Sequence, residues 1–424
     1  RTGIEGHVRC PRRIDQACRR SNDIGEGVVR RNLNSIGRSS GNRSPCKRWR
    51  CSNIRRGICS PIVPAPQDAP FEALTAKTVA MMGDDYPSVV FDLHVKEGDT
   101  VRAGQTLCVD RHRPEICFVA NAGGRVSQIK LGPRRRLEFL EIAVGGDDRV
   151  RFDIDDLRKL LLKSGAWTSF RTRPFGLIPD PIATPDAIFV TATKATPQAP
   201  DPLTVIAAET ANFEGGAEAL LQLTTGPVFI CQRMGAALLV PYDRLEIATF
   251  SGPYPSGYAG PQVHRLMPVS RQRVVWEIGY QDVMAIGHLL ATGQIKTSRV
   301  VSVSGATQTK VGTVRLGAKL ADVVRDMDHL DADCLRSGSR LTGRKSHYLG
   351  RRDLQISTDE KEAFPRPFWH RILDVLPAAP NGATLPMEAF ERAFPFDILP
   401  TPLMRALAIG DVETAERLGC LELV

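Results

Sequence analysis

The spacing of apolar positions changes along this chain, and the changes predict several domains. Between Val90 and Ile129, short alternating strands are separated by glycine turns. From residue 150 to residue 296, apolar runs of strand length alternate with stretches of helical spacing. Alternating strands and helices predict a mostly parallel sheet covered by helices. We therefore expect a multi-domain α/β protein.

The clearest local pattern runs from Val95 to Leu107 and reads VKEGDTVRAGQTL. Turns are expected at Gly98-Asp99 and Gly104-Gln105, because glycine supplies positive φ and aspartate accepts local backbone hydrogen bonds. The pattern resembles the biotinyl/lipoyl-type barrel-sandwich, which we assign to residues 54–149. Carrier members of that fold present a lysine at a hairpin tip, and the corresponding stretch, residues 110–115, has none. We expect a structural domain without a covalent cofactor.

Residues 150–296 predict an α/β domain with a mostly parallel sheet. Helices are expected over residues 214–223 and 281–291, and strands over residues 187–192, 227–231 and 237–240. The glycine fingerprint G-x-G-x-x-G, which lets a pyrophosphate approach a helix N-terminus, is absent from the sequence. Residues 338–346 resemble a P-loop, but Lys345 falls one position late, so we expect no phosphate site there.

The last part of the chain divides into two smaller units. A strand over residues 298–304, a second near 313–316 and a helix over 318–328 predict a small α+β domain, residues 297–350. Residues 351–424 contain many prolines and predict short helices. Within them, Asp411 is expected to cap a helix over residues 412–418, which Gly419 ends.

Charge and cysteine are concentrated at the start of the chain. Residues 1–56 carry a net charge of +11, whereas the rest carries −2, so nothing in the body predicts a nucleic-acid surface. We interpret residues 1–53 as a basic, disordered extension; the alternative is a nucleic-acid-binding arm. No stretch has the roughly 20 apolar residues of a membrane span.

The sequence contains no recognisable metal or catalytic motif. Five of the ten cysteines lie in the first 59 residues, none forms a CxxC pair, and the histidines are isolated. A nucleophile elbow, G-x-S-x-G, is also absent. We therefore expect no metal site and no catalytic residue, and the residues alone favour a binding or scaffold protein.

Several strings in one order carry a family resemblance. They are GYQDVMAIG at residue 279, LGAKL at 316, SGSRLTG at 337, YLGR at 348, FDILPT at 396 and LGCLEL at 418. Together they resemble the NqrA family, the A subunits of sodium-translocating NADH:quinone oxidoreductases, from about residue 54 to residue 423.

The resemblance implies a peripheral subunit on the cytoplasmic face of a bacterial inner-membrane complex. That complex belongs to a respiratory chain and couples NADH oxidation and ubiquinone reduction to sodium export. The resemblance further implies a barrel-sandwich, a Rossmann-like domain, a ubiquitin-like (SLBB-type) α+β domain and a helical C-terminal region. The expected partners are the other subunits and ubiquinone, and NADH, flavins and iron–sulfur clusters are expected on those subunits.

The sequence departs from the family at a histidine-rich turn. Family members read G-x-H-P-A-G followed by T-H-I-H, whereas this chain has Tyr254 and Gln262 in place of two histidines and keeps His264. The family also continues beyond LGCLEL. We expect a divergent member with an N-terminal extension and a short C-terminus.

Quinone binding requires an apolar slot with one or two hydrogen-bond donors. By residue type alone, Tyr280, Gln281 and His264 are the candidates. Packing and capping at the start of a helix would equally explain Tyr280 and Gln281, and Asp282 would simply favour the helix N-terminus.

Two other functions remain open at the level of sequence. A stand-alone binding or scaffold module without a redox role is compatible with the neutral body and the missing histidines. A nucleotide-dependent enzyme is compatible with the α/β sheet, although its glycine fingerprint is missing.

Overall fold

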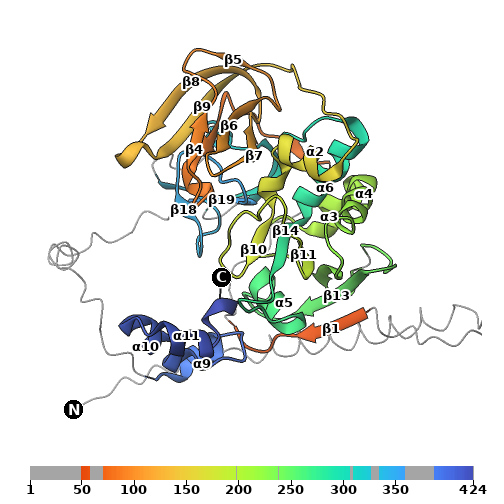
Figure 1. The fold of residues 1–424 in the computed structure, drawn as a ribbon, viewed down its shortest axis with the longest axis vertical. Helices are drawn as coiled ribbons and strands as arrows, with labels where there is room; N and C mark the ends of the chain where they lie inside the picture. Colours follow the sequence, from red (N-terminus) through yellow and green to blue (C-terminus); the bar gives the residue numbers. More distant parts are fainter. Residues whose placement is uncertain are drawn as a thin grey trace, which may run out of the picture.

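The computed structural model describes residues 49–57, 70–196, 198–236, 238–305, 309–325, 334–358 and 386–423. They form a barrel-sandwich, an α/β sheet with helices, a third mixed sheet and a group of C-terminal helices (Figure 1). In Figure 1 the barrel stands at the top, and the C-terminal helices lie at the bottom near α5. Across the described part of the chain, no helix combines the length and apolar character needed to cross a bilayer.

The barrel-sandwich consists of two antiparallel sheets. One contains β3 (Thr78–Met82), β9 (Leu137–Gly146), β8 (Gly123–Leu131) and β5 (Thr100–Val101), and the other β4 (Phe91–Leu93), β6 (Thr106–Asp110) and β7 (Arg113–Val119). Gly98 and Gly104 adopt φ of +95° and +87°, as the turn chemistry predicts. Between the sheets, Phe118 meets Tyr86 and Phe91 edge to face at 4.8 and 5.0 Å.

The hairpin tip that would carry a lysine in a carrier domain instead anchors the barrel. Asp110 is buried and accepts hydrogen bonds from His112 N (3.1 Å) and Arg113 Nε (2.9 Å). Arg113 in turn donates through Nη1 to Ile178 O at 2.9 Å, outside the barrel. Through Arg113, the hairpin tip thus joins the barrel to the α/β domain.

The α/β sheet has the strand order β1-β13-β12-β11-β14-β10. Its parallel strands are β1 (Trp49–Asn53), β11 (Ala187–Ala192), β12 (Val228–Arg233), β13 (Leu245–Ser251) and β14 (Val275–Gly279), while β10 (Arg171–Arg173) is antiparallel. The helices are α2 (Leu157–Lys163), α3 (Pro202–Ala208), α4 (Thr210–Leu220), α5 (Ala259–Leu266) and α6 (Tyr280–Thr292).

Small residues let α4 and α6 pack closely. A Cβ on Gly216 would lie 2.0 Å from Val283 O, and one on Gly287 would lie 1.8 Å from Asn212 O. Only glycine fits at both positions, because the backbones of α4 and α6 approach too closely for a side chain. The close contact fixes α6, whose first turn forms part of the site described below.

The strand expected over residues 237–240 is wrong. Residues 238–240 are not in a strand, and the next strand, β13, begins at Leu245 and runs parallel to β12. A parallel neighbour can pair only after the chain has crossed back over the sheet, so the apolar stretch belongs to that crossover.

The start of the ordered body also differs from the expected boundary at residue 54. Residues 49–53, expected in a disordered extension, form β1 and pair with β13 (Figure 1). Ile54, expected in the barrel, is 3% exposed and packs in the apolar cluster of Phe189 and Phe229. The gain from burying Ile54 explains why this segment joins the α/β sheet. Residues 1–48 lie outside the described residues.

Beside the barrel and the α/β sheet lies a mixed sheet, called here the third sheet, with the order β18-β17-β19-β15-β16-β2. Its members are β2 (Glu72–Ala73), β15 (Ser298–Ser304), β16 (Thr309–Arg315), β17 (Leu335–Ser337), β18 (Arg344–Lys345) and β19 (Gln355–Thr358), with the short helix α7 (Leu320–Val323). The sheet passes the boundary expected at residue 350, because β19 pairs in parallel with β15. The ubiquitin-like assignment stays a prediction.

The C-terminal region contains α9 (Glu388–Ala393), α10 (Pro400–Ile409) and α11 (Val412–Arg417). Asp411 accepts a hydrogen bond from Thr414 N at 3.0 Å, and Gly419 has φ +90°, which confirms the predicted cap and stop. Ion pairs join this region to the α/β domain, including Arg271–Glu416 at 2.6 Å.

Replacing Ile54 with alanine tests whether β1 and its continuation belong to the core. We expect a loss of about 2–4 kcal/mol in the free energy of unfolding, because Ile54 is buried in the α/β domain. The matched control is Ile182→Ala, since Ile182 is 89% exposed and its truncation should change stability by less than about 0.5 kcal/mol. Urea denaturation measures both, and equal effects would contradict the assignment.

Candidate functional site

A crevice opens where the α/β sheet changes direction. From β11 the sheet continues to β12 on one side and to β14 on the other, and ligands of open α/β sheets bind at the carboxyl ends of strands at such a point. The cavity there measures about 290 Å³. Thr191 and Thr193 line it from β11 and the following loop, and Gly279 and Tyr280 line it from the β14–α6 junction.

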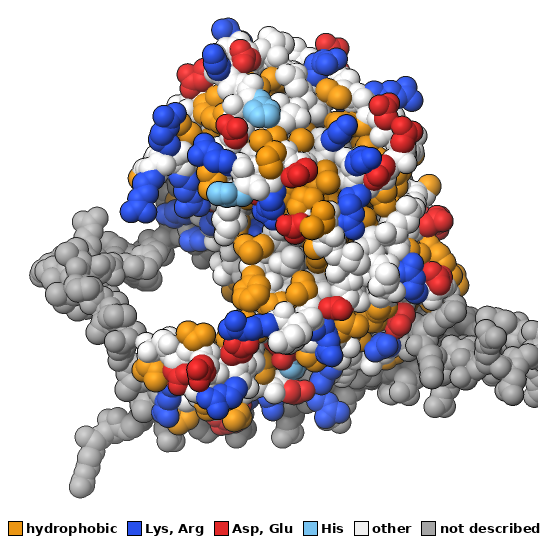
Figure 2. Space-filling view, viewed as in Figure 1, with side chains coloured by type: hydrophobic (Ala, Val, Ile, Leu, Met, Phe, Trp, Pro, Cys, Tyr) orange, Lys and Arg blue, Asp and Glu red, His pale blue; other side chains and the backbone are white. Residues whose placement is uncertain are grey.

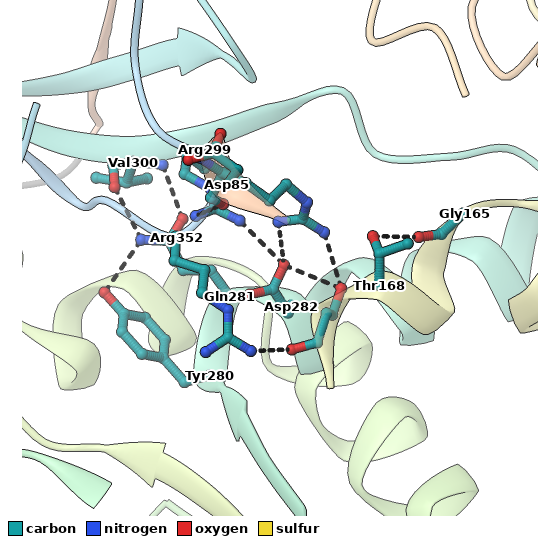
Figure 3. A network of polar contacts seen from close by, with 11 residues as sticks. Asp85, Gly165, Thr168, Tyr280, Gln281, Asp282, Arg299, Val300 and Arg352 are labelled. Atoms are coloured by element: carbon teal, nitrogen blue, oxygen red, sulfur yellow. Dashed lines mark hydrogen bonds and ion pairs between the residues drawn. The ribbon is translucent and has the colours of Figure 1, made fainter. Parts of the chain in front are cut away.

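Asp282, in the first turn of α6, is held by two arginines beside this crevice (Figure 3). Its Oδ1 accepts from Arg299 Nη2 at 3.0 Å and from Arg351 Nη1 at 2.7 Å. Arg299 also donates to Arg351 O, and Arg351 donates to Ser169 Oγ, both at 2.8 Å. Burial opposes ionisation, but Arg351 and Arg299 outweigh it and lower the pKa of Asp282.

A second buried carboxylate lies on β14. Glu277 pairs with Arg173 at 2.8 Å and with Arg352 at 3.1 Å, and despite its burial the two arginines lower its pKa. Burial lowers the pKa of Arg352 to about 10, although Glu277 opposes the shift. Arg352 also donates to Ser169 O at 2.8 Å.

The barrel joins the same network through Asp85. This carboxylate pairs with Arg344 of β18 and accepts from Arg351 N at 2.9 Å. Burial raises its pKa despite Arg344. Because Asp85 follows β3, Asp282 lies on α6 and Arg299 lies on β15, the network connects three sheets that the sequence encodes separately.

Tyr280 and Gln281 lie together at the crevice, as the sequence places them. The Gln281 side chain imitates a neighbouring strand, because Oε1 accepts from Val300 N and Nε2 donates to Val300 O, both at 2.8 Å. Nε2 also donates to Tyr280 Oη at 3.1 Å, so Tyr280 keeps its own proton to donate. Burial raises the pKa of Tyr280 and keeps the hydroxyl neutral.

His264 lies elsewhere. Its Nδ1 contacts the carboxylate of Glu422, and its Nε2 accepts from Asp397 N at 3.1 Å. Both ring nitrogens are therefore committed to the C-terminal region. The structure brings Tyr280 and Gln281 together at the crevice and does not bring His264 to it.

The two positions that depart from the family pattern have structural contacts. Tyr254 packs edge to face on Tyr258 at 5.6 Å. Gln262 is buried and donates to Thr193 Oγ1 at 2.8 Å, which ties α5 to the loop after β11. Tyr258 and Thr193 both line the crevice, so these substitutions act on its wall.

Sequence reasoning missed the charged network. Glu277 stands in the apolar strand VWEIG, and Asp282 stands at the start of a helix with a buried apolar face. A carboxylate that is buried inside such an apolar run needs a cationic partner. The acidic residue within each run was therefore the sequence signal for a buried ion pair. Among the described residues, no group of three or more His, Cys, Asp or Glu side chains could hold a metal ion.

Comparison with known proteins gives the family. The model for the NqrA N-terminal barrel-sandwich hybrid domain matches residues 52–145, and that for the NqrA second alpha/beta domain matches residues 152–295. This chain is 37% identical to two relatives, the Na(+)-translocating NADH-quinone reductase subunits A of Neisseria meningitidis serogroup A and Marinomonas sp.. Both matches cover 87% of this chain and 92% of the relative. This chain belongs to the NqrA family.

The resemblance stated from sequence is therefore confirmed, as is the barrel-sandwich in the first part of the body. Among solved structures, an NAD+-reducing [NiFe]-hydrogenase in the H2-reduced state matches with a TM-score of 0.35 and 14% identity, over 63% of this chain and 57% of that one. So distant a likeness supports no statement about this member of the NqrA family.

Asp282→Asn tests how much the network stabilises the fold. Arg299 and Arg351 would remain buried without their carboxylate, so we expect a loss of about 3–5 kcal/mol in the free energy of unfolding. The control is Asp147→Asn, because Asp147 is 87% exposed and its pair with Arg315 should contribute less than about 1 kcal/mol. Denaturation in guanidinium measures both; a small loss at Asp282 would show that the network is not structural.

Proposed function

We propose that this chain acts as the NqrA component of a sodium-translocating NADH:quinone reductase. The observation that carries the proposal is the similarity to proteins of that name, which extends over 92% of their length. The chain would lie on the cytoplasmic face of a bacterial inner membrane, as a peripheral subunit. NADH, flavins and iron–sulfur clusters would be bound by other subunits.

The geometry supports a part in the quinone-reduction step. The crevice has apolar residues such as Ile278 and Leu354 among polar ones, and a neutral donor, the Tyr280 hydroxyl, aligned by Gln281. Arg173 and Arg299 also line it, and each has one buried nitrogen without a hydrogen-bond partner, Nη1 and Nε respectively. A quinone head group offers two carbonyl acceptors to such donors. In this proposal Tyr280 binds the head group, Gln281 positions Tyr280, and His264 secures the C-terminal helices.

Co-expression with the membrane partner subunits tests the assignment to the complex. We expect this chain to co-purify with them after detergent extraction and to restore sodium-dependent quinone reductase activity to a complex lacking its own NqrA component. A chain that stays separate, with or without the partners, would instead favour a stand-alone binding module.

Tyr280→Phe tests the quinone contact. The variant removes one donor and keeps the ring volume, and Gln281 keeps both bonds to Val300. We expect the KM for a water-soluble ubiquinone analogue to rise about tenfold, with the KM for NADH unchanged. Tyr242→Phe, at a 41% exposed tyrosine, is the control. An unchanged quinone KM in Tyr280→Phe would remove Tyr280 from the site.

A further inference from the structure

A second cavity lies at the carboxyl ends of β11, β12 and β13. It measures about 360 Å³, within the range of small-ligand sites. Leu203, Met234 and Phe250 give it an apolar wall, and Lys194 and Arg233 give it a charged one. It lies on the opposite side of β11 from β14, and the two cavities share Thr193 and Gly257.

The two cations of this cavity differ in exposure, since Lys194 is half-buried and Arg233 is exposed. Two other arginines of the sheet pair with carboxylates, Arg50 with Glu246 and Arg173 with Glu277. No hydrogen bond or ion pair joins the side chain of Lys194 or Arg233 to any residue in the described part of the chain. The nearest acid in the wall is Asp201, which caps α3 by accepting from Leu203 N at 3.2 Å.

Lys194 has a charged neighbour of each sign in the cavity wall, Asp201 and Arg233. Partial burial lowers the pKa of Lys194, Asp201 opposes the shift, and Arg233 lowers the pKa further. An anion between Lys194 and Arg233 would offset the repulsion from Arg233 and compensate the desolvation of Lys194.

The backbone around the cavity holds Lys194 in place and leaves the mouth open. A Cβ on Gly257 would lie 1.8 Å from Lys194 O, so only glycine allows this loop to support the lysine so closely. Gly235, at φ +82° in the turn after β12, has nothing within 4 Å of its Cβ position. An entering molecule would meet Lys194 and Arg233 without displacing a side chain at Gly235.

We propose that this cavity binds a small organic anion, whose phosphate or carboxylate group contacts Lys194 and Arg233 and whose apolar part packs on Met234 and Phe250. The loop from Thr193 to Asp201 contains no glycine, so it lacks the cradle that a dinucleotide pyrophosphate needs. The ligand is therefore smaller than a dinucleotide. This site shares Thr193 and Gly257 with the quinone crevice, but the proposal does not rest on the proposed function.

Calorimetric titration of the full chain with phenyl phosphate and, separately, with benzoate tests the proposal. At least one probe should bind saturably, and the comparison decides between phosphate and carboxylate. Lys194→Met and Arg233→Met should each weaken binding about tenfold or more. Lys194→Arg should retain it, because the charge remains.

The matched control is Lys96→Met, which removes one positive charge from an exposed position in the barrel and should leave the affinity unchanged. Circular dichroism establishes that each variant is folded. If a Met variant fails to fold, binding to the wild-type chain should still weaken as the pH rises and Lys194 loses its proton. The proposal is overturned if neither probe binds, if NADH binds more tightly than both, or if Lys194→Met and Lys96→Met bind alike.

Discussion

The carboxylate of Asp282 faces Arg299 and Arg351 in the interior, and the arrangement of the domains depends on that contact. A buried charge without a partner costs several kcal/mol, so replacing any one of these three residues destabilises the burial of the others. Asp282 lies in the first turn of α6, Arg299 lies in β15, and Arg351 lies just before β19. Buried ion pairs therefore join the α/β domain to the third sheet.

The same constraint explains the contents of the crevice. Gln281 stands between Tyr280, which lines the crevice, and Asp282, which pairs with the arginines. The Gln281 side-chain amide donates to Val300 O and accepts from Val300 N. The orientation of Tyr280 is thus coupled to the register of β15. Figure 2 shows that side chains of both charge signs are mixed over the face of the molecule in view.

Features encoded by neighbouring residues could be predicted from the sequence, and features that join distant residues could not. Gly98, Gly104 and the Asp411 cap are local, and each adopts the predicted conformation. The strand over residues 298–304 is also found at its predicted limits. By contrast, Asp85 and Arg344 are separated by 259 positions, and no local pattern announces their pairing.

His264 shows the limit of choosing site residues by type. Residue type alone made His264 a candidate for a quinone contact, but its partner Glu422 lies 158 positions away and only the fold brings them together. Tyr280 and Gln281 were placed beside each other because they are consecutive. The crevice that they line forms only because β11 and β14 are neighbours in the sheet, and the spacing of apolar residues does not specify that strand order.

The short strand β1 has a consequence for how this protein behaves outside its complex. It covers the outer side of β13, whose peptide groups would otherwise be free to pair with another polypeptide. A truncated version starting after Asn53 would present that bare edge to solvent. Because β1 is the terminal strand of the sheet, its removal would move the open edge to the longer strand β13, and self-association is the consequence to expect.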